Sequence, residues 1–109
     1  MDKEELRLEG CGNTLTACVL CELDHHTVAR IRKRIDEEVF FFSPEILVLD
    51  FSAVGFMDSS GIALILGRVE VARAVGAAVH LSGLSRPLMK LVRLSGIDRV
   101  EGVVIRGGE

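Results

Sequence analysis

Strand-type and helix-type hydrophobic patterns alternate along this sequence, and this alternation restricts the fold more than any single residue does. The run Ile46–Asp50 is short and rich in leucine and β-branched residues, which indicates a buried strand. Residues 59–75 carry apolar side chains at three- and four-residue spacing and are followed by Gly76, which predicts a helix with a left-handed glycine cap. A strand followed by a helix is the repeating unit of an α/β fold whose sheet is mostly parallel.

The same patterns predict further elements on both sides of this unit. Strands are expected at residues 6–9, 14–21, 78–82 and 100–105, and helices at residues 27–41 and 85–94. The tetrad of residues 10–13 contains two glycines and an asparagine, which favours a hairpin turn and therefore an antiparallel first strand. We therefore predict a single α/β domain over residues 1–109. Its mostly parallel, mixed sheet has the N-terminal hairpin strand at or near an edge and helices packed on it.

Composition limits the classes of function that this domain can serve. With 109 residues and 49% hydrophobic content, the chain is long enough for one domain with one core. Its apolar runs are too short to cross a membrane and its acidic start does not resemble a signal peptide, so we expect a cytoplasmic protein without a membrane partner. A net charge of -3, a pI near 5.6 and the absence of Trp and Tyr argue against DNA or RNA binding. Protein partners are the remaining expectation.

The residues that commonly bind metals or form disulfides are poorly arranged for either role. Cys11, Cys18 and Cys21 are an odd set expected to be reduced, and we interpret Cys18 and Cys21 as buried small hydrophobic residues. His25 and His26 are adjacent and have no acid or cysteine at ligand spacing. No metal site and no cofactor are therefore expected.

Polar residues stand where three predicted strands lead into helices. They are Asp24 to Thr27, Asp58 to Ser60, and Ser82 with Ser85, and such loops share one edge of a parallel sheet. Asp58 is the natural N-cap of the second helix, which places Ser59 and Ser60 in its first turn. The free N–H groups and the helix dipole there favour an added negative charge.

Two alternatives remain open at this stage. An Asp-Ser pair at a helix start is most often only a cap, and a small enzyme could instead use Ser59 as nucleophile with His25 or His26 as base. In the same helix Leu64, with Gly67 and Arg68 beside it, either forms a small exposed apolar patch rimmed by charge or is covered by neighbouring elements.

Two separated motifs carry a resemblance to a known family. The first is Glu22-Leu23-Asp24-His25-His26-Thr27, and the second runs from Asp50 through Phe56-Met57-Asp58-Ser59-Ser60-Gly61 to Gly67-Arg68. In order and spacing they resemble the anti-sigma factor antagonists of spore-forming bacteria, in the STAS domain family. The resemblance extends to Arg93-Leu94-Ser95-Gly96-Ile97 and so covers nearly the whole chain.

This resemblance implies a regulatory protein and not an enzyme. The unmodified antagonist would bind an ATP-dependent anti-sigma factor serine kinase and free the sigma factor. Phosphorylation by that kinase would end the interaction, and a serine phosphatase would restore it. Ser59 corresponds to the phosphate acceptor. The implied partner-binding residues are Asp24, His25, His26, Asp58, Ser59, Ser60, Gly61, Leu64 and Arg68. A general stress-response antagonist or another STAS regulatory module is the alternative within this class.

Overall fold

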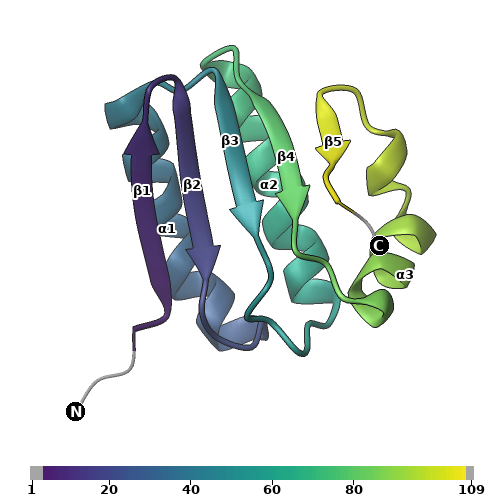
Figure 1. Ribbon diagram of the computed structural model, residues 1–109. Coiled ribbons are helices and arrows are strands. Elements are labelled where there is room, and N and C mark those ends of the chain that lie inside the picture. The colour runs from purple at the N-terminus through teal and green to yellow at the C-terminus, as the bar shows by residue number, and fades with distance from the viewer. Residues whose placement is uncertain (1–3, 108–109) are drawn as a thin grey trace.

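Five strands form one sheet in the order β1-β2-β3-β4-β5, and helices connect the parallel strands (Figure 1). The computed structural model describes residues 4–107, so expectations that fall on residues 1–3, 108 and 109 lie outside the described part of the chain. The elements in chain order are β1 (Leu6–Cys11), β2 (Thr14–Val19), α1 (His25–Phe42), β3 (Ile46–Asp50), α2 (Ser59–Ala74), β4 (Ala78–Ser82), α3 (Arg86–Ser95), the short 3-10 helix η1 (Ile97–Arg99) and β5 (Val103–Ile105).

The direction of the strands agrees with the predicted mixed sheet. β1 is an edge strand and pairs antiparallel with β2, whereas β2, β3, β4 and β5 pair in parallel. β1 continues to Cys11, which pairs with Thr14, so the hairpin turn is only Gly12 and Asn13 and not the predicted tetrad. Gly12 has a φ of +62°, a conformation that suits the first position of a two-residue hairpin turn.

The core lies on one face of the sheet. Figure 1 shows α1 and α2 side by side behind the strands, with α3 beyond the β5 edge. Alternate residues of the three central strands point to these helices and are buried: Leu15, Ala17, Val19, Leu47, Leu49, Val79 and Leu81. Within residues 4–107, no helix covers the opposite face, on which Thr16, Val48 and His80 are neighbours.

Local capping fixes where the helices begin and end. Ser85 accepts a hydrogen bond from the N–H of Leu88 at the start of α3, and Gly96 ends this helix with a φ of +85°, as predicted. Gly76, with a φ of +77°, follows α2 in the predicted left-handed conformation. The last strand is shorter than expected because η1 and a turn at Gly102 occupy residues 97–102.

The cysteines are less buried than the sequence suggested. Cys18 and Cys21 are only partly buried, and Cys11 is exposed. Partial burial raises the pKa of the Cys18 and Cys21 thiols, with the carboxylates of Asp50 and Glu5 adding to the effect respectively. Both thiols are therefore protonated and weakly nucleophilic at neutral pH.

Candidate functional site at the carboxyl edge of the sheet

The loops that precede α1 and α2 are joined by backbone hydrogen bonds. Leu23 and Met57 form a parallel β-bridge, in which the Leu23 N–H donates to the Phe56 carbonyl at 3.0 Å. The Asp58 N–H donates in turn to the Leu23 carbonyl at 3.3 Å. Because Leu23 and Met57 are both buried, the two helix starts are held together through the core. The predicted meeting of these two loops at one edge is confirmed.

Glu22 fixes the second loop through a contact that sequence analysis did not assign. Its Oε1 atom accepts hydrogen bonds from the N–H groups of Gly55 at 3.1 Å and Phe56 at 2.8 Å. Phe56 is 53% exposed although it is a large aromatic residue. Glu22 and Phe56 are 34 residues apart, and no local pattern relates two such distant residues.

Asp24 is the N-cap of α1. Its carboxylate accepts hydrogen bonds from the N–H groups of His26 at 2.9 Å and Thr27 at 3.0 Å, and the Thr27 hydroxyl oxygen accepts from the Asp24 N–H. This reciprocal capping box starts the helix at His25, so His25 and His26 are helical and the prediction of a loop there was wrong. The hydrogen bond from Thr27 is the main reason that the pKa of Asp24 lies below its usual value.

Asp58 caps α2 in the way the sequence predicted. Its carboxylate accepts a hydrogen bond from the Ser60 N–H at 2.7 Å, and its carbonyl accepts from the Gly61 N–H at 2.9 Å. Ser59 is the first helical residue and is exposed, whereas Ser60 is partly buried. The Ser59 hydroxyl is therefore accessible to another protein.

Gly61 is buried directly under this helix start. A Cβ atom at this position would lie 2.7 Å from the Met57 Cβ and Sδ atoms. A side chain there would push Met57 away from its bridge with Leu23, so the absence of a side chain keeps the two loops together.

The prediction of an exposed patch at Leu64 was wrong. Leu64 is 2% exposed and Arg68 is 5% exposed, so the alternative, a helix covered by its neighbours, is correct. α2 packs against both α1 and the sheet and therefore needs apolar residues around more of its circumference than a surface helix does. Leu66, at 41% exposed, is the leucine of this helix that faces solvent.

Arg68 crosses to α1 instead of rimming a patch. Its Nε atom lies 3.0 Å from Oδ1 of Asp36, with 6% of the arginine side chain and 27% of the aspartate side chain exposed. Burial lowers the pKa of Arg68 and raises that of Asp36, while the pair's mutual attraction opposes both shifts. Leu64 and Arg68 remain near the site because they line a groove of about 330 Å³ between α1 and α2, together with His25 and Ser60.

The third predicted loop, which contains Ser82 and Ser85, makes fewer hydrogen bonds to its neighbour than the first two loops make to each other. The Ser82 carbonyl accepts a hydrogen bond from the Phe51 N–H at 2.9 Å, which links the end of β4 to the segment after β3. Ser85 serves as the cap of α3. The bond between Phe51 and Ser82 connects the third loop to its neighbour along the edge, as the parallel strands imply, whereas the Ser85 cap is a contact within α3.

The described residues contain neither a metal-binding cluster nor a helix that could span a membrane. Residues 4–107 contain no group of three or more His, Cys, Asp or Glu side chains placed to hold a metal ion. None of the helices in this part of the chain combines the length and the apolar character that a membrane span requires.

The sequence matches the model of the STAS domain family over residues 9–106, so the chain belongs to this family. Among named relatives, the anti-sigma F factor antagonist of Paenibacillus polymyxa is 34% identical over 88% of this chain and 82% of its own length. That of Lysinibacillus sphaericus is also 34% identical, with 76% of this chain and 82% of the relative covered. The resemblance expected from the two motifs is thus confirmed.

Solved structures extend the comparison to the fold. The anti-sigma factor antagonist SpoIIAA in its unphosphorylated form superposes with a TM-score of 0.78 at 30% identity, covering 94% of this chain and 89% of SpoIIAA. Bacillus SpoIIAA in its phosphorylated form gives a TM-score of 0.71 at 30% identity, covering 94% and 92% of the two chains. The single α/β domain with a five-stranded mixed sheet and three α-helices is therefore the STAS fold of SpoIIAA.

Proposed function

We propose that this chain is an anti-sigma factor antagonist of the SpoIIAA type, regulated by phosphorylation of Ser59. The observation that carries the proposal is the exposed Ser59 at the first position of α2, directly after its Asp58 cap. The similarity to SpoIIAA, which is known in unphosphorylated and phosphorylated forms, supports the assignment. The unmodified protein would bind an anti-sigma factor serine kinase and release the sigma factor.

A phosphate on Ser59 can change binding without unfolding the domain. The group adds a charge of about -1.5 to -2, which the free N–H groups and dipole at the start of α2 tolerate. The phosphate weakens the free energy of binding to the partner, because a dianion must lose its hydrating water when it enters a packed interface. A loss of about 3 kcal/mol would weaken binding roughly a hundredfold, and an unpaired charge in an interface readily costs this much.

The proposed kinase-binding face consists of the two joined helix starts. Its exposed members are His25, His26, Asp58 and Ser59. Asp24, Ser60 and Gly61 would act mainly by shaping these helix starts, and Leu64 and Arg68 by lining the adjoining groove. We add Phe56 as an apolar anchor, since exposed aromatic residues beside a polar rim are typical of interface centres.

We place the protein in the cytoplasm, where ATP is available to the kinase. A serine phosphatase would return the phosphorylated protein to its active form.

The proposed function assigns no catalytic residue to this chain. In residues 4–107, no hydrogen bond joins the Ser59 hydroxyl to a histidine that could serve as its base. Covalent labelling of Ser59 by a serine-reactive phosphonate would instead support the alternative, a small enzyme that uses Ser59 as its nucleophile.

The test uses the purified chain with a recombinant anti-sigma F factor kinase from one of the relatives and ATP. We expect one phosphate on Ser59 by mass spectrometry. Ser59→Ala should bind the kinase but remain unmodified, and Ser59→Asp should fold normally yet bind at least about tenfold more weakly, because its charge mimics part of the phosphate. Circular dichroism checks the fold, and isothermal titration calorimetry measures the affinity.

Ser60→Ala is the matched control for this experiment. Its side chain makes no hydrogen bond within the described residues, and the cap uses its backbone N–H, so phosphorylation and binding should both persist. Phosphate found on Ser60 in the unchanged chain, or equal kinase affinity for Ser59→Asp and the unchanged chain, would contradict the proposal.

A further inference from the structure

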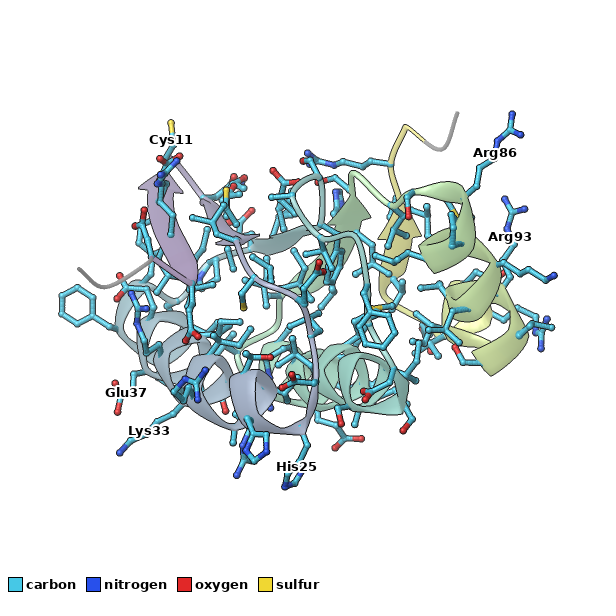
Figure 2. All side chains as sticks on the ribbon, turned by 90° about the horizontal axis from the view of Figure 1, so that it is seen from below. Cys11, His25, Lys33, Glu37, Arg86 and Arg93 are labelled. Atoms are coloured by element: carbon cyan, nitrogen blue, oxygen red, sulfur yellow. The ribbon has the colours of Figure 1, made fainter. Side chains whose placement is uncertain are left out.

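One side of α1 presents a row of polar and apolar residues, most of which lie outside the proposed kinase-binding face and its groove. Ala29, Arg32, Lys33, Asp36, Glu37 and Phe40 line a shallow groove of about 420 Å³ along this helix. Their three- and four-residue spacing places them in one stripe, which we call the α1 stripe. Figure 2 shows Lys33 and Glu37 projecting outward from α1, away from the sheet.

The charges of the α1 stripe are largely unpaired within the described chain. In residues 4–107, no salt bridge involves Arg32, Lys33 or Glu37, whereas Asp36 turns inward to Arg68. Phe40, at the end of the stripe, is 59% exposed. The stripe therefore combines a large apolar side chain with charges that are free to pair.

The order of these charges does not stabilise the helix itself. Basic residues come first and acidic residues follow, and α1 has no acidic residue in its first turn and no basic residue in its last. This is the opposite of what the helix dipole favours. Lys33 also precedes Glu37 by four residues, which is the weaker orientation for an ion pair within one helix.

A second α1 stripe in the antiparallel direction complements the first. A two-fold axis level with the midpoint of residues 34 and 35 places Phe40 of one copy over Ala29 of the other and Glu37 of one copy beside Lys33 of the other. Each contact occurs twice, as a two-fold interface requires. We propose that the α1 stripe is a self-association surface through which two copies of this chain form an antiparallel α1–α1 dimer.

A second copy fits better than an unrelated partner because the stripe carries both basic and acidic side chains, so an identical stripe in the reverse direction supplies the opposite charges. A basic half followed by an acidic half matches itself only when reversed, which is what a two-fold axis does. The dimer uses none of the exposed members of the proposed kinase-binding face, although Ala29 and Arg32 also line the groove beside that face. Lys33, Glu37 and Phe40 do not line it, so variants at these three positions test the dimer separately from the proposed function. One helix face gives a small interface, and the dimer should be weak and transient.

Sedimentation equilibrium of the full chain across a concentration series tests the proposal. We expect a monomer at about 1 µM and a substantial dimer fraction at about 1 mM, as small interfaces of weak complexes imply. Raising the ionic strength from about 0.02 to 0.5 M should weaken the dimer several-fold, since exposed charge pairs are screened. A chain that stays monomeric at about 1 mM in low salt would overturn the proposal.

Charge reversal tests the geometry. Glu37→Lys places two lysines together and Lys33→Glu places two glutamates together at each of these contacts, so each variant alone should dimerise at least about tenfold more weakly. Mixed together, the two variants should form a heterodimer, because every reversed charge then meets an opposite one. A mixture that remains monomeric would show that the stripes do not pair as proposed.

Two control variants separate the stripe from the rest of α1. Arg34→Glu makes a similar charge change on another face of the helix and should leave the dimer unchanged. Phe40→Ala should weaken it, whereas Phe41→Ala should not, although Phe41 is more exposed at 85%. Equal effects of Phe40→Ala and Phe41→Ala would contradict the proposed interface.

Discussion

Two glycines of α2 have opposite surroundings although they are only six residues apart. Gly61 is buried with Met57 at 2.7 Å from the position of a Cβ atom, whereas a Cβ at Gly67 would meet no atom within 4 Å. Neither needs a positive φ, so the difference is one of space and not of backbone conformation. Gly61 is required by the bridge between the two loops, and Gly67 is not.

This contrast predicts opposite effects of the same substitution. Gly61→Ala should lower the free energy of unfolding by about 1–2 kcal/mol, because the clash with Met57 exceeds the gain in helix propensity. Gly67→Ala should raise it by about 0.5–1 kcal/mol, because it gains the propensity without a clash. Urea denaturation measures both. A stabilising Gly61→Ala would mean that Met57 moves freely and does not fix the loop.

The pairing of α1 with α2 depends on one buried ion pair as well as on apolar contacts. Arg68 is the only charged residue among those described in residues 4–107 that is buried, and Asp36 is its only partner. Its Nε and Nη1 atoms lack hydrogen bonds of good geometry. Such a pair costs desolvation when it forms and leaves an uncompensated charge when one member is removed.

We therefore expect Arg68→Ala to lower the free energy of unfolding by about 2–4 kcal/mol, since it removes the partner of Asp36 and leaves a cavity. Arg68→Met should recover at least half of this loss, because methionine fills most of the space without a charge. Arg73→Ala, on the same helix but exposed, is the control and should change stability by less than about 0.5 kcal/mol. Thermal denaturation followed by circular dichroism provides the comparison.

The whole sheet has one face without a helix in residues 4–107, and His80 lies on it between neighbouring strands. The Nε–H of Arg106 donates a hydrogen bond to Nδ1 of His80 at 2.8 Å. Partial burial, and to a smaller degree the Arg106 charge, lower the pKa of His80 below its ordinary value of 6.5. The folded protein thus binds a proton at His80 less readily than the unfolded chain.

The sign of this shift predicts a pH dependence of stability. Above pH 6.5 the contribution of the neutral His80 is fully present, and it should be lost as the pH falls from 6.5 through the lower pKa of the folded state. Arg106→Met should reduce this loss, since it removes the hydrogen-bond donor and the nearby charge that disfavour protonation. Urea unfolding between pH 7 and 5, with an NMR titration of His80, measures both effects; an unchanged pKa in Arg106→Met would contradict this account.

Most of the fold and the chemical character of the site could be predicted from local sequence patterns. Periodicity located every strand and every α-helix, with errors only at their ends, and the caps Asp58, Ser85, Gly76 and Gly96 were correctly assigned. Asp24 was recognised as a polar loop residue but not as a cap, which moved the start of α1 by two residues. The assignment of Ser59 as a phosphate acceptor remains a prediction from family resemblance.

The sequence alone determined the features that depend on residues close together in the chain. These are the hydrophobic period, the turn residues and the helix caps, each of which acts over only a few residues. Only the tertiary structure decided that Leu64 and Arg68 are buried under α1, that Glu22 holds the loop carrying Phe56, and that Gly61 must fit beneath Met57. These contacts join residues whose proximity depends on how helices and loops pack against one another. The geometry around Ser59 is therefore a property of the assembled edge of the sheet and not of the segment that contains this serine.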